Sequence, residues 1–205
     1  MTIVPLFFSN DRCMKKNKAK KRVTLIILEG VWGSGKTTLA RALKIKYHAH
    51  IIKEPHHVRA GVRLGSPDSL TDWYIHTHEE NLKKGAALAL RDNVVVIERS
   101  ALSSIVFAKV FLKKNSRKAL SDFEKSVKRL RVEGVDVCVA YLHPANAKSM
   151  LVRMKRSIYL KKFAEIECVK KLDMCLLEEL RTLKKKKILR LMFRPKPGDF
   201  SKLAR

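Results

Sequence analysis

Residues 30–37 read Gly30-Val31-Trp32-Gly33-Ser34-Gly35-Lys36-Thr37, which matches the pattern G-x-x-x-x-G-K-[ST]. An apolar, strand-like run, Val23–Leu28, precedes this segment, and a helix-like run starting at Thr38 follows it. Glycines allow left-handed backbone angles and close approach, so successive N–H groups can turn towards phosphate oxygens at a helix N-terminus. The segment predicts a loop that binds the phosphates of ATP through Gly30, Val31, Trp32, Gly33, Ser34, Gly35, Lys36, Thr37 and Thr38.

Two side chains of this loop have specific expected roles. Lys36 is expected to reach the β- and γ-phosphates, and the hydroxyl of Thr37 is placed to ligate Mg²⁺. The sequence therefore predicts ATP and Mg²⁺ as ligands.

Strand-like and helix-like patterns alternate along the rest of the chain. Short apolar runs predict strands at 23–28, 50–53, 94–97, 135–142 and 188–193. Helical patterns fall at 36–47, from Asp68 or Ser69 to 90, and at 103–113, 118–131, 146–156 and 164–185. This alternation favours an α/β fold, a three-layer doubly wound parallel sheet of about five strands with helices on both faces.

The composition is that of a globular protein with one domain. The chain has 205 residues, of which 46% are hydrophobic. We expect a basic leader at 1–21, one domain at 22–193 and a basic tail at 194–205. The four cysteines show no C-x-x-C pair or metal-ligand spacing, so we interpret them as reduced, mostly buried thiols of a cytoplasmic protein. No apolar stretch approaches the roughly 18 residues of a membrane helix.

The chain is strongly basic. It has 45 Lys and Arg residues against 19 Asp and Glu residues, a formal net charge of +26. Part of this surplus is clustered at 15–22 and 184–187 and in the tail. Such a field attracts nucleic acid in a salt-dependent way. Solvated basic tails are the favoured interpretation, because charge runs are often flexible and no aromatic residues are interleaved with these lysines.

Polar residues follow the predicted strands at the points where the strands end. These are Glu54, the pair Glu98-Arg99, and His143. In an open parallel sheet, ligands gather beyond the carboxyl ends of the strands. Glu98 is a candidate Mg²⁺ ligand, and Arg99 could orient Glu54 or neutralise a transferring phosphoryl group. The alternative is a purely structural Glu98–Arg99 pair.

A basic connector separates the last two predicted helices. Arg153 and Arg156 lie in a segment, about 153–163, that could close over the γ-phosphate as a lid and stabilise transition-state charge. The alternative is the charged face of an amphipathic helix. The lid is favoured because Met150, Leu151 and Met154 supply an apolar face from which these cations are excluded.

Four ordered motifs resemble the thymidylate kinase and deoxynucleoside kinase superfamily of P-loop kinases. They are Glu29-Gly30-x-x-Gly33-Ser34-Gly35-Lys36-Thr37-Thr38, Glu54-Pro55, Glu98-Arg99-Ser100, and Tyr141-Leu142 before Arg153-x-x-Arg156. The resemblance covers about residues 23–185 and implies phosphoryl transfer from ATP. Glu98-Arg99-Ser100 is similar to the deoxynucleoside kinase form. Ser103-Ser104, Phe107 and Lys161-Lys162-Phe163 look more like thymidylate kinase.

The chain also departs from this superfamily. It contains no glutamine, so the amide that reads the base in many deoxynucleoside kinases is missing. His56-His57 replaces the small residues that commonly follow Glu-Pro in thymidylate kinases. On the long helix that includes Trp73, the side chains of His76, His78 and Asn81 could supply hydrogen bonds and stacking instead, although a helical histidine is more often plain surface or core.

The phosphoryl acceptor is either a nucleoside or a nucleoside monophosphate. Glu54 would be the general base for a nucleoside hydroxyl. For a monophosphate, Arg59 or Arg63 would hold the acceptor phosphate, and Glu54 would orient arginines or water. Ser103 is a further candidate to bind the substrate. The two arginines and the positive field favour a nucleoside monophosphate as substrate, with a deoxynucleoside kinase as the alternative. A homodimer is left open.

Two readings from other classes compete with the kinase. One is a P-loop ATPase stimulated by nucleic acid that is bound by the basic tails. The other is a scaffold that binds nucleotide without catalysis, against which the intact Lys36, Thr37, Glu98 and Arg99 argue.

Overall fold

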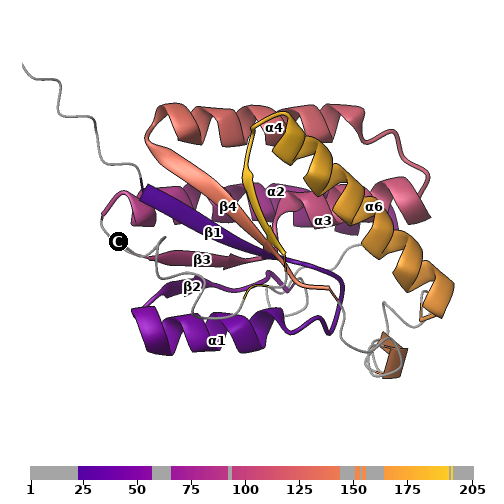
Figure 1. The fold of residues 1–205 in the computed structure, drawn as a ribbon. Coiled ribbons are helices and arrows are strands. Elements are labelled where there is room, and N and C mark those ends of the chain that lie inside the picture. Colours follow the sequence, from indigo (N-terminus) through magenta and orange to yellow (C-terminus); the bar gives the residue numbers. More distant parts are fainter. Residues whose placement is uncertain are drawn as a thin grey trace, which may run out of the picture.

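The computed structural model describes residues 23–56, 66–91, 94–143, 151–152, 154–155, 164–193 and 195. Within them, five strands form one sheet in the order β2-β3-β1-β4-β5, and every pairing is parallel (Figure 1). The strands are β1 (Val23–Glu29), β2 (His50–Ile52), β3 (Val95–Glu98), β4 (Val135–Tyr141) and β5 (Arg190–Phe193). The doubly wound α/β class expected from the sequence is confirmed.

Helices cover both faces of this sheet. The helices are α1 (Lys36–Tyr47), α2 (Pro67–Ala89), α3 (Ala101–Phe111), α4 (Arg117–Val132) and α6 (Ile166–Lys185). Figure 1 shows α1 on one face and α2, α3, α4 and α6 on the other. The first strand accounts for this division, because successive side chains of a strand point to opposite faces. Leu25 and Ile27 pack into the large core with α2, α3 and α6, whereas Ile26 and Leu28 pack with α1.

Two helices begin earlier than the sequence pattern indicates. Ser66, rather than Asp68 or Ser69, caps α2, and its hydroxyl accepts a hydrogen bond from the backbone N–H of Ser69 in a capping box. Ser100 caps α3, so this helix starts at Ala101 instead of 103. In both cases the serine hydroxyl accepts a hydrogen bond from one of the free N–H groups of the first turn.

The cysteines agree in part with expectation. Cys138, Cys168 and Cys175 are free thiols; Cys138 is buried in β4, whereas Cys168 and Cys175 on α6 are only partly buried. Of the helices in the described part of the chain, none is both long and apolar enough to span a bilayer.

Candidate active site

The glycine loop connects β1 to α1 in a conformation that needs its glycines. Gly30, Gly33 and Gly35 have φ angles of 138°, 76° and 94°, a region that L side chains rarely adopt. A Cβ atom on Gly30 would lie 2.2 Å from the backbone oxygen of Leu142 and 2.8 Å from the Ser34 Oγ. The loop therefore follows the β4 end so closely that only glycine fits at position 30.

Helix α1 presents an open N-terminus to this loop. It begins at Lys36 after Gly35, and no side chain caps it. The first N–H groups of a helix have no partner within the helix, and the helix dipole favours an anion there. Thr37 and Thr38 are exposed in this first turn. The geometry is suited to a phosphate group.

Lys36 is buried and folded back over the loop. Its Nζ donates hydrogen bonds to the backbone oxygens of Gly30 (2.8 Å) and Val31 (3.0 Å). Burial, and then the positive charge of Arg99, lower the pKa of Lys36 to about 7. The ammonium group is thus held where its charge is poorly compensated, and a bound anion would stabilise it.

Glu54 and Arg99 form an ion pair that joins the ends of β2 and β3. Arg99 Nε lies 2.8 Å from Glu54 Oε1, and the side chains are 7% and 36% exposed, respectively. Burial opposes the charge of Glu54, but Arg99 and Lys36 outweigh it and hold the pKa of this carboxyl below its ordinary value. The sequence-predicted pairing of Glu54 with Arg99 is present.

Arg99 is held by unusual backbone geometry. Its φ angle is 77°, an uncommon value for a residue with a side chain, and its N–H continues the β1–β3 ladder to Leu28 O at 3.0 Å. The guanidinium lies 5.9 Å from the centroid of the Trp32 ring. Its Nη1 donates to Ser103 Oγ at 3.1 Å, while Nη2 has no hydrogen-bond partner among the described residues.

Glu29 is a site residue to which the sequence analysis assigned no role. This last residue of β1 is 0% exposed. Its Oε1 accepts from Ser100 N (2.8 Å) and Ser100 Oγ (2.6 Å), and its Oε2 accepts from Ser103 Oγ (2.5 Å). Because Ser103 also accepts from Arg99, Glu29 links the phosphate loop to the Arg99 turn. The sequence signal that could have identified Glu29 is its position as an acidic residue at the end of an apolar strand, the same signal that identified Glu98.

His78 lies in α2 next to this charge cluster. It is 2% exposed, and neither Nδ1 nor Nε2 has a hydrogen-bond partner in the described part of the chain. Burial lowers the pKa of His78 to about 4, against the effect of Glu54. Its ring is stacked with that of Tyr74 at a centroid distance of 6.1 Å. A buried imidazole with two free nitrogens is costly unless a ligand meets it.

The other predicted residues divide into three groups. Glu98, the last residue of β3, and Ser103 are buried with the cluster. Trp73, on α2, is partly buried, and its ring lies 4.9 Å from that of Tyr74, centroid to centroid. Arg59, Arg63, Arg153, Arg156 and most of the expected lid, 153–163, lie outside the described residues.

His143, after β4, belongs to a second polar group. Its Nδ1 lies 2.9 Å from Asp173 Oδ2, and the buried Tyr141 donates to Asp173 Oδ1 at 2.5 Å. Burial and this hydrogen bond raise the pKa of Tyr141. These contacts attach the end of β4 to α6, so the structure gives His143 a packing partner on α6.

Oxygen ligands for a hard cation are available near the loop. The Thr37 hydroxyl is exposed in the first turn of α1, and the Glu98 carboxylate ends β3. No group of three His, Cys, Asp or Glu side chains suited to a metal ion occurs within the described ranges. Mg²⁺ commonly uses one or two protein oxygens together with phosphates and waters, so this donor set fits Mg²⁺.

The fold and the loop define a P-loop protein of the nucleotide-kinase architecture. No family model matches the chain, and no curated protein matches it. A deoxyadenosine kinase from M. mycoides with bound dATP is 17% identical, with a TM-score of 0.53 over 85% of this chain and 91% of that chain. The M. mycoides deoxyadenosine kinase with the products dCMP and a flexible dCDP is 16% identical, with a TM-score of 0.53 over 86% and 90%. These likenesses confirm the fold implied by the resemblance to the thymidylate kinase and deoxynucleoside kinase superfamily.

Proposed function

We propose that the protein transfers the γ-phosphoryl group of ATP to the 5′-hydroxyl of a nucleoside. The observation that carries this proposal is the ion pair between Glu54 and Arg99, 2.8 Å apart, at the same sheet edge as the glycine loop. This arrangement supports a site in which a carboxylate accepts a hydrogen bond from the acceptor hydroxyl next to a loop that binds a triphosphate.

The charge of the cluster favours a neutral acceptor. The charged groups that act on Lys36 are Arg99 and the carboxylates of Glu54, Glu29 and Glu98. Three carboxylates thus face two cations, and Arg99 is already paired with Glu54. To bind a second phosphate, the cluster would need a cation that is not already paired with a carboxylate, whereas binding a hydroxyl needs none.

Glu54 and Arg99 act together in the proposed reaction. Because the pKa of Glu54 is held below its ordinary value, the carboxylate stays ionised near neutral pH and can accept a hydrogen bond from the acceptor hydroxyl. It orients the oxygen for in-line attack and takes up the hydroxyl proton as the new O–P bond forms and the bond from the γ-phosphorus to the bridging oxygen breaks, which releases ADP. Arg99, freed in part from Glu54, then stabilises charge on the transferring group.

The glycine loop binds the donor. The N–H groups at the start of α1 and Lys36 hold the phosphates, and Lys36 exchanges its bonds to the Gly30 and Val31 oxygens for phosphate oxygens. Mg²⁺, held by Thr37 and Glu98 in this proposal, would neutralise charge on the β- and γ-phosphates.

His78 is proposed to bind the acceptor. Its imidazole is neutral near pH 7, so it offers one donor and one acceptor nitrogen. A hydrogen bond to the nucleoside would satisfy a buried group that has no partner among the described residues. The solved M. mycoides structures named above are of deoxyadenosine kinase, and one holds the product dCMP, a nucleoside monophosphate, which supports a nucleoside as the acceptor class.

A nucleoside monophosphate is the second candidate acceptor. It was favoured by the sequence because Arg59 and Arg63 could hold a second phosphate. These arginines lie outside the described residues, and the described cluster supplies no unpaired cation beyond Lys36. The preference for the hydroxyl rests on the described cluster alone, in which Arg99 is already paired with Glu54.

The test is label transfer from γ-labelled ATP with Mg²⁺ to a panel of deoxynucleosides and deoxynucleoside monophosphates. We expect labelled monophosphates from nucleosides. Glu54→Gln should lower kcat about 10²–10⁴-fold with little change in ATP binding, and Lys36→Ala should abolish transfer with the fold retained. Glu80→Gln, an exposed carboxylate on α2, is the matched control and should be as active as wild type. Transfer only to monophosphates, or an unimpaired Glu54→Gln enzyme, contradicts the proposal.

A further inference from the structure

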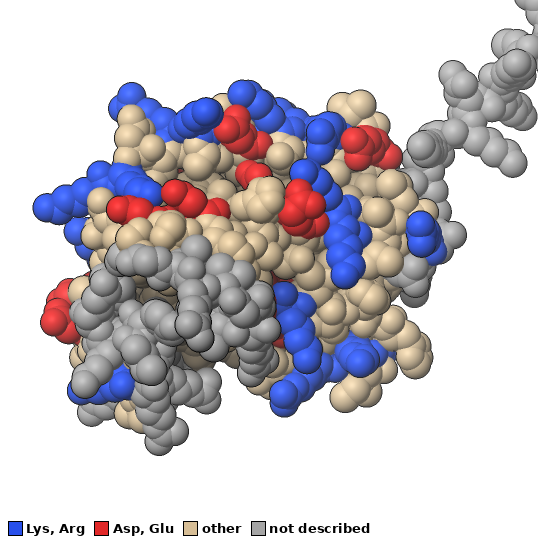
Figure 2. Space-filling view, turned by 180° about the vertical axis from the view of Figure 1, so that it is seen from behind, with Lys and Arg blue, Asp and Glu red and all other residues tan. Residues whose placement is uncertain are grey.

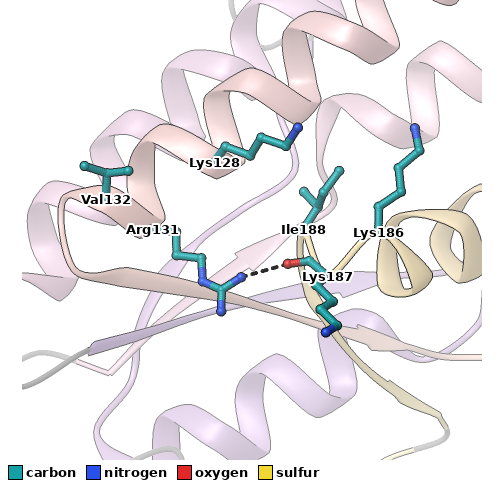
Figure 3. Close-up of a pocket in the computed structure, with 6 residues that line it drawn as sticks. All are labelled: Lys128, Arg131, Val132, Lys186, Lys187 and Ile188. Carbon is teal, nitrogen blue, oxygen red and sulfur yellow. Dashed lines mark hydrogen bonds between the residues drawn. The ribbon is translucent and has the colours of Figure 1, made fainter.

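A hollow of ≈ 480 Å³ lies where helices α4 and α6 end. Its lining residues are Lys128, Arg131, Val132, Lys186, Lys187 and Ile188 (Figure 3). Helix α4 leads into β4, and α6 leads into β5. The hollow is therefore at the edge of the parallel sheet where the strands begin, opposite the edge that carries the candidate active site.

Four of the six lining residues are cations, and only part of their charge is compensated. Lys186 Nζ lies 2.6 Å from Glu124 Oε1, and Arg131 Nε lies 3.6 Å from Asp136 Oδ1. Arg131 also donates to the backbone oxygen of Lys187 at 2.8 Å. Lys128 and Lys187 are exposed, and no acid of the described ranges lies within ion-pair distance of them. In Figure 3, Lys128 and Lys186 extend to one side of Ile188 and Lys187 to the other.

Helix ending alone does not account for these residues. A cation near a helix C-terminus interacts favourably with the helix dipole, by about 0.3–1 kcal/mol at an exposed site. Lys187, moreover, has a φ angle of 56°, where glycine or asparagine is favoured and another residue costs about 1–2 kcal/mol. Position 187 therefore carries a cation where glycine would cost less backbone strain.

The charge is also unevenly distributed over the molecule. On the face drawn in Figure 2, Lys and Arg side chains lie along the upper edge and also on the left and at the lower right, and most Asp and Glu side chains lie between them. The exposed acids of α2, such as Asp68 and Asp72, fix Lys114 by ion pairs at 3.0 and 3.5 Å. Acids of α2 thus compensate the charge of Lys114, whereas no ion pair of this kind involves Lys128 or Lys187 among the described residues.

We propose that this basic hollow binds the phosphate backbone of nucleic acid. The lining of the hollow carries a positive charge. Among the lining side chains, the exposed apolar one is Val132, which is 88% exposed. A protein partner would require buried apolar or aromatic anchors, and a membrane surface would require several side chains to insert. A free nucleotide would need a group to stack on its base. A nucleic acid backbone needs only cations, and the net charge of +26 attracts it over long range.

The test measures binding of the full-length protein to a fluorescent DNA duplex of roughly 20 base pairs over a series of salt concentrations. The variant Lys128→Gln/Lys186→Gln/Lys187→Gln removes three charges of the hollow. The matched control, Lys44→Gln/Lys84→Gln/Lys171→Gln, removes three exposed charges from α1, α2 and the first half of α6. Circular dichroism checks that both variants remain folded.

Each phosphate contact contributes about 0.9 to the slope of log K against log salt. We expect the hollow variant to lower this slope by roughly 2–3 and the control by less than about 1. Equal loss in both variants, or no duplex binding by the wild type, overturns the proposal. Binding to phosphatidylserine vesicles is measured with the same variants. If the three substitutions weaken vesicle binding but leave duplex binding unchanged, the partner is a membrane surface and the proposal is wrong. Label transfer to nucleosides should be unchanged in the hollow variant, so this result and the proposed kinase function stand or fall separately.

Discussion

Replacing Glu29 should both destabilise the protein and misplace Arg99. The carboxylate is 0% exposed and accepts three hydrogen bonds, from Ser100 N, Ser100 Oγ and Ser103 Oγ. Glu29→Ala removes all three and leaves buried donors and Arg99 undercompensated, a change that typically costs about 3–5 kcal/mol. Glu29→Gln keeps the volume and one acceptor oxygen, so about 1–3 kcal/mol is expected from the lost charge-assisted bond.

Urea unfolding measures these differences in the free energy of unfolding, and thermal unfolding measures the corresponding change in Tm. For a chain of this size, a loss of about 3–5 kcal/mol corresponds to a fall in Tm of roughly 6–20 °C. Asp136→Asn is the control, because it also removes a carboxylate from a strand. This carboxylate is 26% exposed and pairs with Arg131 on the surface, so the free energy of unfolding should fall by less than about 1 kcal/mol. If Glu29→Ala unfolds within about 1 kcal/mol of wild type, the hydrogen-bond network does not hold this turn.

Three further outcomes follow from the site geometry. ATP binding near pH 8 should take up close to one proton, because the pKa of Lys36 is about 7 before the phosphates raise it. Calorimetry of ATP binding in buffers of different ionisation enthalpy measures this uptake. The Lys36→Met variant should show none. His78→Leu should unfold at equal or higher urea concentration than wild type at pH 7 while impairing nucleoside binding. Because folded His78 has a pKa of about 4, below its ordinary 6.5, wild type should lose stability relative to His78→Leu as pH falls from about 6.5 to 4; parallel pH dependences would contradict this. Gly30→Ala should weaken ATP binding at least about tenfold, because the added Cβ would meet the backbone oxygen of Leu142. Gly134 also has a positive φ, 94°, but its Cβ would meet open space. Gly134→Ala should therefore lower the free energy of unfolding by about 1 kcal/mol and leave ATP binding intact.

The local sequence was sufficient for the elements and for part of the site. Apolar runs such as Val23–Leu28 identify buried strands, and the glycine spacing identifies the loop, because both signals depend on neighbouring residues. Glu54 and Arg99 could be placed together because parallel strands end at one edge. Their ion pair is the part of the candidate site that sequence reasoning anticipated most directly.

Tertiary structure decided the rest, because it depends on contacts between distant residues. The β1–β3 register pairs Leu28 with Glu98, and this brings Glu29 to Ser100 and Ser103, 71 and 74 residues away in the chain. His78 has an ordinary helical context, and only the packing of α2 against the sheet buries it beside Glu54 and Arg99. The basic hollow likewise exists only because α4 and α6 end side by side. Sequence patterns report the nearest neighbours of a residue, whereas strand order and register set which carboxylates and cations share one low-dielectric site.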